Sequence, residues 1–334
     1  MITIQNNNDL SLDQWIANRF NSIGASEVSP ICFGSRYTSN IEIYYQKVSG
    51  ITRMIENIRT YTGKKSENIV DQFYPYYEGT EDSIWVNHNS GKIIRSIENK
   101  NVTGGNDKYS HLTATPDRFT KCLYSNKEIL TEYKNTQGYI LKQWEPGLPI
   151  DHVIQNLTQL KVFEKKDGHI FYYIDNRCFR LEEMQSDKFK SQWDIVLEIT
   201  TDFWNRVMKA RPIYNQMCEF KRKFNMKAAA EAEVEIQQLE PPVQYSQGYL
   251  NFINENYKNR ASLVGKKATE AEIILAKKYK EIAKKEEKLK KEKLQIEIDL
   301  KKSMDGAKVI DMGKLGNVSW QQYDNRKIFK VNIK

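Results

Sequence analysis

The chain has 334 residues, of which 40% are hydrophobic and 11% aromatic, so it can bury the core of one large domain or two ordinary ones. No run of about 18 apolar residues is present, which excludes a transmembrane helix, and the N-terminal "MITIQNNNDLSLDQW" has no signal-peptide pattern. The net charge of +8 is concentrated in Val243–Lys334, which holds 21 Lys and Arg against 12 Asp and Glu. That asymmetry suits a polyanionic partner as well as it suits a solvated Lys-rich helix.

Helical patterns dominate the first eighty residues. Ser11 and Asp13 predict a helix start before "QWIANRF", and a short helix is expected from about Ser26 to a break at Gly34. Two further helices are predicted in "SNIEIYYQKVSG", which stops at Gly50, and in "GKKSENIVDQFYPYY". The four cysteines lie far apart without C-x-x-C spacing, which argues against a zinc or iron–sulfur site.

From Ile84 to Asn135 the hydrophobic period changes to two, which predicts a β-meander of "SIWVNH", "KIIRSIEN", "SHLTATPDRF" and "EILTEYKNT". A helix with Asp151 as its N-cap is expected in "DHVIQNLTQLKVFEKK", followed by the strands "HIFYYID" and "CFRLEEM". The long helix "SDKFKSQWDIVLEITTDFWNRVMKA" is then expected to end or kink near Pro212.

The C-terminal part has a different composition. Residues 225–244 look like a linker between a domain at 1–224 and a Lys-rich helical extension at 245–334. Glu286 and Lys293 interrupt the apolar seam of the extension, which favours an antiparallel helical hairpin over a long coiled coil, and "GNVSWQQYDNRKIFKV" predicts a terminal strand pair or arm. The extension carries two apolar stripes: Leu250, Ile253, Tyr257, Ala261 and Val264, then Leu275, Tyr279, Ile282, Leu289, Ile296 and Leu300.

Three charged residues of the meander are expected to converge. Glu132 and Lys134 are two residues apart in a strand, so their side chains share a face, and Asp117 lies near the end of the preceding strand. Two converging carboxylates repel each other unless a cation lies between them, and oxygen ligands suit Mg²⁺ or Mn²⁺. With a lysine nearby, such a site fits metal-assisted phosphodiester hydrolysis. Taken alone, the same residues also fit a salt pair on an edge strand.

The residues around this group bring in a known pattern. "R-x6-S-E" matches Arg19 to Glu27, "G-x3-E" matches Gly63 to Glu67, and "ATPD", "EYK" and "HVIQ" follow in order. Over about residues 10 to 210 the chain resembles the PD-(D/E)XK nucleases, and within them the phage lambda exonuclease or YqaJ-type viral recombinase family. The resemblance implies an α/β fold with a restriction-endonuclease-like core, in which helices flank a central mixed β-sheet.

The resemblance also implies roles for individual residues. Asp117 and Glu132 would hold the metal, with the backbone carbonyl of Tyr133 as a further ligand, while the side chain of Tyr133 points away. Glu67 would complete the acidic cluster, and Lys134 would position the attacking water. Mg²⁺ is the expected ion, with Mn²⁺ as an alternative.

Three more residues follow from the same resemblance. Gln155 would support the metal site from its helix, and Arg19 and Ser26 would bind the 5′-phosphate of a DNA end. The chain departs from the family at two positions: Arg118 stands where glycine is common, and Leu157 stands where a second glutamine is common. Neither departure removes a metal ligand.

The expected function is a Mg²⁺-dependent deoxyribonuclease that digests linear double-stranded DNA from its ends, 5′ to 3′, in phage-type recombination or repair. The family pattern implies a homotrimeric ring around DNA, and a single-strand annealing protein is an expected partner. The lack of a long apolar run predicts no membrane insertion, and the missing signal-peptide pattern with four scattered cysteines predicts the cytoplasm of a bacterium or phage-infected cell. Two alternatives stay open. One is a structure- or site-specific endonuclease of the same fold, and the other is a non-catalytic DNA-binding or scaffold protein.

Overall fold

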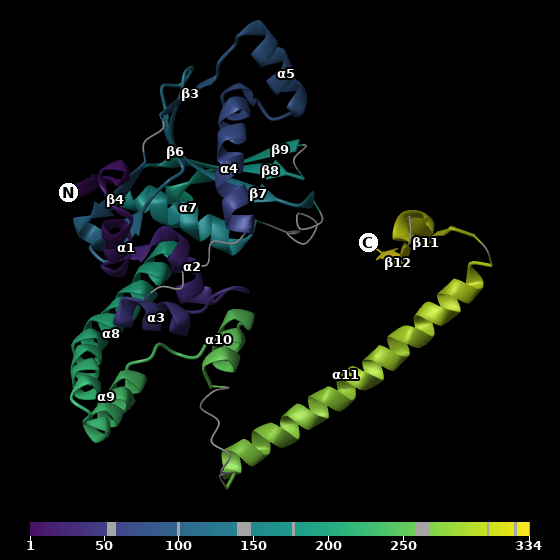
Figure 1. Cartoon of the computed structure of the whole chain (residues 1–334). Helices are drawn as coiled ribbons and strands as arrows, with labels where there is room; N and C mark the ends of the chain where they lie inside the picture. The colour runs from purple at the N-terminus through teal and green to yellow at the C-terminus, as the bar shows by residue number, and fades with distance from the viewer. Residues whose placement is uncertain are drawn as a thin grey trace. The chain divides into compact units, whose positions relative to one another are not determined.

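The computed structural model describes residues 1–51, 58–98, 101–138, 148–175, 178–257, 267–305, 307–323 and 326–333 (Figure 1). The chain divides into two compact units, Met1–Ala261 and Ser262–Lys334. Ala261 and Val264, which were assigned to the first apolar stripe of the extension, lie outside the described residues.

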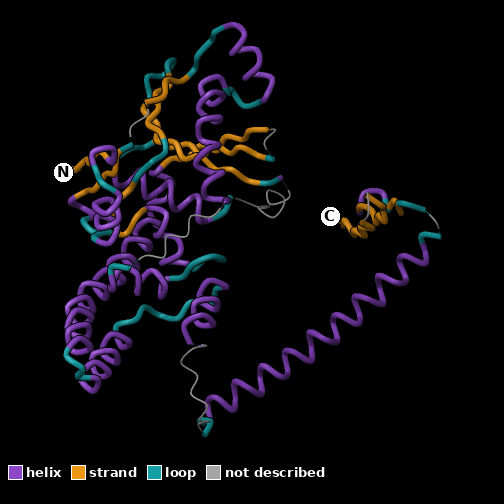
Figure 2. Tube along the Cα trace, viewed as in Figure 1, coloured by secondary structure: helices purple, strands orange, loops and turns teal. Residues whose placement is uncertain are grey.

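The centre of the first unit is a five-stranded mixed sheet (Figure 2). Its strand order is β3-β6-β7-β8-β9; β7 and β8 run parallel, and all other neighbours run antiparallel. Because β6 pairs with β7 in the register Arg118 to Thr131, the start of β6 lies beside the middle of β7. The strands are β3 (Arg95–Glu98), β6 (Arg118–Cys122), β7 (Glu128–Thr136), β8 (Asp167–Ile174) and β9 (Cys178–Gln185).

Helices cover both faces of this sheet (Figure 1). On one face, α7 (Ile150–Val162) buries Leu157 and Leu160 in the core that also contains Ile170 of β8. On the other face, α4 (Ile58–Phe73) packs through Val70 in the cluster that contains Phe171. The alternation of side chains along β8 therefore divides the apolar residues between two cores. The prediction of a central mixed sheet flanked by helices is confirmed.

A second, four-stranded sheet in the order β1-β4-β5-β2 leads into the start of β6. The helix α1 (Leu12–Phe20) begins at a capping box of Ser11 and Gln14, as the sequence predicts. The helix α2 (Ala25–Phe33) follows β2 directly and packs on α7. The strands are β1 (Ile2–Asn6), β2 (Ile23–Gly24), β4 (Val102–Asn106) and β5 (Leu112–Ala114).

The helices α3 (Asn40–Ser49), α8 (Lys190–Arg222), α9 (Met226–Gln238) and α10 (Gln247–Tyr257) complete the first unit. Most of the stretch predicted as a linker is α9, which packs along α8 and buries Ala229, Ala232 and Ile236. Alanine has the highest helix propensity and small side chains that pack closely, so this Ala-rich run forms a helix and not a hinge. The helix α8 continues through Pro212 and buries Met217 beyond it.

The sequence assignment needs two corrections in the meander and one in the helix that follows it. "SIWVNH" lies in the helix α5 (Glu81–Ser90), not in a strand, because Thr80 caps its start and Gly91 adopts the left-handed conformation at its end. The strand β4 lies in "NVTGGNDK", which the predicted meander leaves as a connection between two of its strands. The helix α7 begins at Ile150, and Asp151 does not cap it but accepts a hydrogen bond from Ser29 Oγ at 2.6 Å.

The second unit consists of the helix α11 (Glu270–Ser303) and a small antiparallel sheet, β10 (Val309–Asp311), β11 (Gly316–Tyr323) and β12 (Arg326–Ile333). The predicted terminal strand pair is thus present as β11 and β12. In the first unit, Phe252 of α10 stacks on Tyr45 of α3 with ring centroids 5.9 Å apart. Pairing of α10 with α11 as a hairpin stays a prediction. None of the described helices is long and apolar enough to cross a membrane.

Candidate active site

Glu132 is the centre of the candidate site. Its side chain lies on the α7 face of the sheet and is only about 5% exposed. Oε1 accepts hydrogen bonds from Lys134 Nζ at 2.7 Å and from Gln155 Nε2 at 2.6 Å. Lys134 Nζ also donates to Gln155 Oε1 at 2.9 Å. The three predicted site residues therefore form one closed hydrogen-bonded group between β7 and α7.

Gln159 is a fourth member of this group that the sequence analysis missed. It is fully buried, and its Nε2 donates to Glu132 Oε2 at 2.6 Å. Residues four apart lie on one face of a helix, so Gln155 and Gln159 approach Glu132 together. The position where the family often has its second glutamine is Leu157, which is fully buried in the apolar core. The four-residue spacing of the glutamines in "QNLTQ" was the available signal.

Asp117 lies immediately before β6 and beside Glu132. Its Oδ2 accepts a hydrogen bond at 2.7 Å from the backbone N–H of Tyr133. Burial, and then the negative charges of Glu132 and Glu67, raise the pKa of Asp117 well above its ordinary value. For the Lys134 ammonium, burial lowers the pKa, but the adjacent Glu132 and Asp117 outweigh burial and raise it. The lysine is therefore a permanently charged hydrogen-bond donor.

Glu67 has Arg118 as a neighbour in addition to Asp117. Its carboxylate lies 3.6 Å from Nη1 of Arg118, and Arg118 in turn is held by Asp71 of α4 through Nε–Oδ1 at 2.8 Å and Nη2–Oδ2 at 2.7 Å. Tyr133 donates its hydroxyl to Asp71 at 3.0 Å, so its side chain lies on the α4 face, away from Glu132. Arg118 is buried and neutralises acids of α4; its side chain is only 7% exposed.

Among the described residues, no three Asp, Glu, His or Cys side chains come together as a metal-binding group. That Glu67 joins Asp117 and Glu132 around a metal stays a prediction: its charge raises the pKa of Asp117, and its carboxylate also lies 3.6 Å from Nη1 of Arg118. The pair of Asp117 and Glu132 still fits a divalent cation. Both donors are oxygens, and their mutual repulsion, seen in the raised pKa of Asp117, is what a bound cation relieves.

Arg19 and Ser26 come together in a cavity of about 300 Å³. Gln155 lines the same cavity, so the predicted phosphate-binding residues and the Glu132 group are adjacent. Ser26 is exposed in the first turn of α2, where backbone N–H groups point outward. Arg19 is 45% exposed on the last turn of α1. The roles of these residues stay predictions, but their positions are consistent with them.

Glu27, the last residue of the "R-x6-S-E" match, organises this cavity. Its Oε2 accepts from the Gly24 N–H at 2.7 Å and lies 2.7 Å from Lys47 Nζ, and its Oε1 lies 3.9 Å from Nη2 of Arg19. The guanidinium of Arg19 also lies over the Trp15 ring, 5.0 Å from its centroid. Glu27 thus fixes the turn before α2 and orients Arg19, which explains the spacing of this motif.

Comparison with known proteins finds one family model and one curated relative that are similar to this chain. Residues 14–166 match the model of the YqaJ-like viral recombinase domain. The uncharacterized protein YqaJ of Bacillus subtilis (strain 168) is 25% identical over 203 residues. That match includes 60% of this chain, and the chain spans 57% of the length of that relative.

Two solved structures are similar at lower sequence identity. The alkaline exonuclease LHK-Exo from Laribacter hongkongensis matches with a TM-score of 0.45 and 12% identity, over 62% of this chain and 98% of that one. A phage-related exonuclease from Haemophilus somnus 129PT matches with a TM-score of 0.37 and 8% identity, over 56% of this chain and 95% of that one. Residues 14–166 are therefore similar to the YqaJ-like viral recombinase domain, and the YqaJ protein of Bacillus subtilis is a distant relative over a similar share of the chain.

Proposed function

We propose that this protein is a divalent-metal-dependent deoxyribonuclease that digests linear double-stranded DNA from its ends, 5′ to 3′. The observation that carries the proposal is the buried Glu132, which accepts hydrogen bonds from Lys134, Gln155 and Gln159 and lies beside Asp117. Hydrolysis of a phosphodiester develops negative charge on the phosphate oxygens. A cation held by the two acids, together with the charged lysine, would stabilise that charge. The similarity of residues 14–166 to the YqaJ-like viral recombinase domain supports the same activity.

Asp117, Glu132 and the backbone carbonyl of Tyr133 are the residues that would hold the ion, Mg²⁺ with Mn²⁺ as the alternative. When bound, such an ion polarises the phosphate and makes a coordinated water more acidic. Lys134 contributes a positively charged hydrogen-bond donor held 2.7 Å from Glu132 Oε1, which orients water or stabilises a phosphate oxygen. Gln155 and Gln159 fix the carboxylate of Glu132 in its orientation.

The cavity that contains Arg19 and Ser26 supplies the preference for ends. A terminal 5′-phosphate carries more negative charge than an internal phosphodiester, so it is bound more tightly by a guanidinium and by N–H groups at a helix start. Gln155 lines the cavity and also donates a hydrogen bond to Glu132. A 5′-phosphate bound in the cavity would therefore place the end of the DNA strand next to the hydrolytic residues.

The test is a digest of linear duplex DNA labelled at its ends, prepared with and without 5′-phosphates, and compared with a covalently closed circle. We expect Mg²⁺-dependent loss of the linear duplex, faster with 5′-phosphates, and no cleavage of the circle. Arg19→Ala is expected to equalise the rates on the two kinds of end, while Arg222→Ala, at an exposed position at the end of α8, keeps the preference. Equal rates for the wild type on both ends would remove the phosphate-binding assignment.

The two alternatives make different predictions in the same experiment. A structure- or site-specific endonuclease cuts the closed circle, and a DNA-binding or scaffold protein digests neither substrate and shows no Mg²⁺ or Mn²⁺ binding by calorimetry. The assembly of this chain as a homotrimeric ring, and its pairing with a single-strand annealing protein, stay predictions that the family resemblance implies. Light scattering tests the trimer, and a clean monomer of 39.2 kDa would contradict it.

A further inference from the structure

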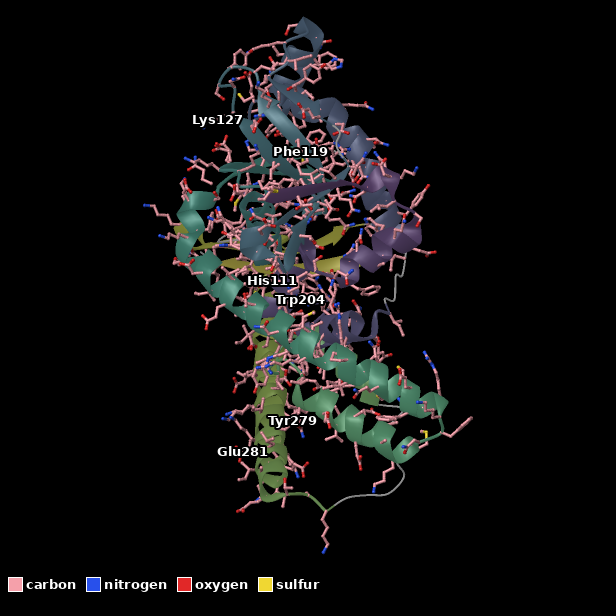
Figure 3. The ribbon with its side chains drawn as sticks, turned by 90° about the vertical axis from the view of Figure 1, so that its left-hand side faces the viewer. His111, Phe119, Lys127, Trp204, Tyr279 and Glu281 are labelled. Carbon is pink, nitrogen blue, oxygen red and sulfur yellow. The ribbon has the colours of Figure 1, made fainter. Side chains whose placement is uncertain are left out.

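The helix α11 carries an apolar stripe that is exposed within its own unit. α11 is one uninterrupted helix that begins at a capping box of Thr269 and Glu272. Tyr279 lies on this helix in Figure 3 and is 77% exposed. Such a row of large exposed side chains marks an interaction surface. The most exposed members of the stripe are Leu275, Tyr279, Ile282, Leu289 and Ile296, each between 53% and 77% exposed.

The spacing of the stripe alternates between four and three residues, which is the heptad pattern of a helix that pairs with another helix. Glu281, labelled beside Tyr279 in Figure 3, lies off this seam. The d positions are Leu275, Ile282, Leu289 and Ile296, and the a positions are Tyr279, Glu286, Lys293 and Leu300. The two charged residues occupy successive a positions in the middle of the seam, with Leu289 at the d position between them. Apolar residues occupy the seam positions on either side.

We propose that the occupant of this seam is α11 of a second copy of the chain, running antiparallel in full overlap. In an antiparallel pair, a positions face d positions of the other helix. Full overlap buries all eight seam positions, whereas a shift by one heptad leaves two layers at each end without a partner. The layers are Leu275 with Leu300, Tyr279 with Ile296, Ile282 with Lys293 and Glu286 with Leu289, each formed twice.

The buried charges favour this direction. In the antiparallel pair, Glu286 lies one layer from the second copy's Lys293 on one side and one layer from the second copy's Glu286 on the other. The charged side chains thus follow the order lysine, acid, acid, lysine along the rod, and no charged position faces a like charge within a layer. In a parallel pair in register, Glu286 would face the second copy's Glu286, and Lys293 the second copy's Lys293. Like charges at facing core positions destabilise a coiled coil, so they exclude the parallel arrangement.

The flanking g positions agree with the core. In the antiparallel register, Lys278 meets the second copy's Asp299, and Lys285 meets the second copy's Glu292. Each pair forms twice by symmetry, so all four contacts join opposite charges. In a parallel pair, g positions face e positions, which brings Lys285 to the second copy's Lys290 and gives repulsion. Charges at e and g positions set helix orientation, and here they select the antiparallel one.

The ends of α11 are compatible with such a rod. At the C-terminal end, Met304 and Val318 are buried within the second unit, and Lys301 lies over the Trp320 and Phe329 rings at 5.0 and 4.9 Å. These contacts fix the small sheet to the last turn, beyond the last seam layer. The eight layers span about 38 Å at 1.5 Å per residue. The proposal rests on α11 alone and is independent of the nuclease assignment.

Light scattering on the full-length protein tests the pairing. We expect the wild type to have an even number of chains, two if α11 alone joins copies and six if it also joins two of the trimeric rings that the family pattern implies, and we expect Ile282→Gln with Leu289→Gln to reduce its mass by half or more. The matched control is Ile274→Gln with Leu294→Gln, which removes apolar side chains of similar exposure, 59% and 57%, that lie off the seam, and it should leave the mass unchanged. A wild type with one or three chains, or a seam variant that keeps its mass, overturns the proposal. The latter result is expected if the chain's own α10 covers the seam.

Disulfide trapping tests the direction. A chain with Lys278→Cys is mixed with a differently tagged chain with Asp299→Cys and treated with a thiol oxidant, and linked peptides are identified by mass spectrometry. We expect a disulfide between the thiol of Lys278→Cys in one chain and the thiol of Asp299→Cys in the other. This disulfide should form only when both variant chains are present. Tyr279→Cys alone should not link to itself, because this a position faces a d position. Efficient self-linking of that variant would show a parallel pair and overturn the antiparallel register.

Discussion

Gln159 offers the sharpest test of how the candidate site is built. The change Gln159→Met keeps the volume of the side chain but removes the N–H that donates to Glu132 Oε2 at 2.6 Å. The other two donors, Lys134 and Gln155, both bind Oε1. The variant therefore leaves one oxygen of a buried carboxylate without its glutamine donor.

A hydrogen bond to a charged group contributes about 1.5 to 3 kcal/mol to stability. We expect Gln159→Met to lower the free energy of unfolding by that amount in urea denaturation. If the same loss appears in the transition state, kcat on linear duplex falls by about 10- to 150-fold. The KM for DNA should change little, because Gln159 is fully buried and does not reach the substrate.

A double-mutant cycle separates this role from simple packing. Glu132→Gln replaces the carboxylate by a neutral amide, so in that background Gln159→Met should destabilise the protein by clearly less than in the wild type. A loss of stability that is equal in both backgrounds would refute the claim that Gln159 acts through Glu132. An unchanged kcat in Gln159→Met would refute its role in positioning that carboxylate.

Three further predictions concern the surroundings of the site. Asp71→Asn leaves the buried Arg118 without its bidentate carboxylate and should lower the free energy of unfolding by about 2 kcal/mol in urea denaturation, a loss limited by the nearby Glu67; full stability would contradict the pairing. Gly168→Ala places a methyl group 2.4 Å from a side-chain oxygen of α7, so we expect about 1–3 kcal/mol of destabilisation and lower activity, whereas Gly105→Ala, which meets nothing within 4 Å, should be milder. Burial lowers the pKa of His111 to about 4 and of His169 to about 3, from 6.5. Because the unfolded chain binds more protons below pH 6.5, each histidine should remove about 2 kcal/mol of stability between pH 7 and pH 5; a flat denaturation midpoint over that range would contradict this.

The contact between Glu132 and Lys134 could be predicted because two-residue spacing in a strand puts side chains on one face regardless of the rest of the fold. Asp117 followed from a short hairpin connection, and Gln155 from the resemblance. Gln159 was missed because the family pattern directed attention to Leu157, although spacing of four on a helix predicts a shared face. The contact of Glu67 with Arg118 could not be predicted, because the burial of Arg118 against Asp71 is a tertiary contact that no local pattern shows.

The errors in the fold have similar causes. "SIWVNH" alternates like a strand, but Thr80 caps a helix there and two acids occupy its first turn. For a short apolar run, the capping residues determine whether a helix or a strand forms. The Ala/Glu run at Met226–Gln238 looked like a linker because it has few large apolar residues, yet small residues suffice against the surface of α8. Patterns with several agreeing signals, such as the capping box of α1 and the glycine stop of α3, were placed correctly.

The central claim is that Asp117, Glu132 and Lys134 form a hydrolytic site. The most direct measurement is the release of nucleotides from linear duplex DNA, with Mg²⁺ and with a chelator, by the wild type, Lys134→Ala and Lys127→Ala. Lys127 is an exposed lysine at the far end of the same hairpin, 57% exposed. We predict that Lys134→Ala is inactive and folded, and that the wild type and Lys127→Ala digest the duplex only with Mg²⁺. Mg²⁺-dependent digestion by folded Lys134→Ala at the rate of the wild type would contradict the account.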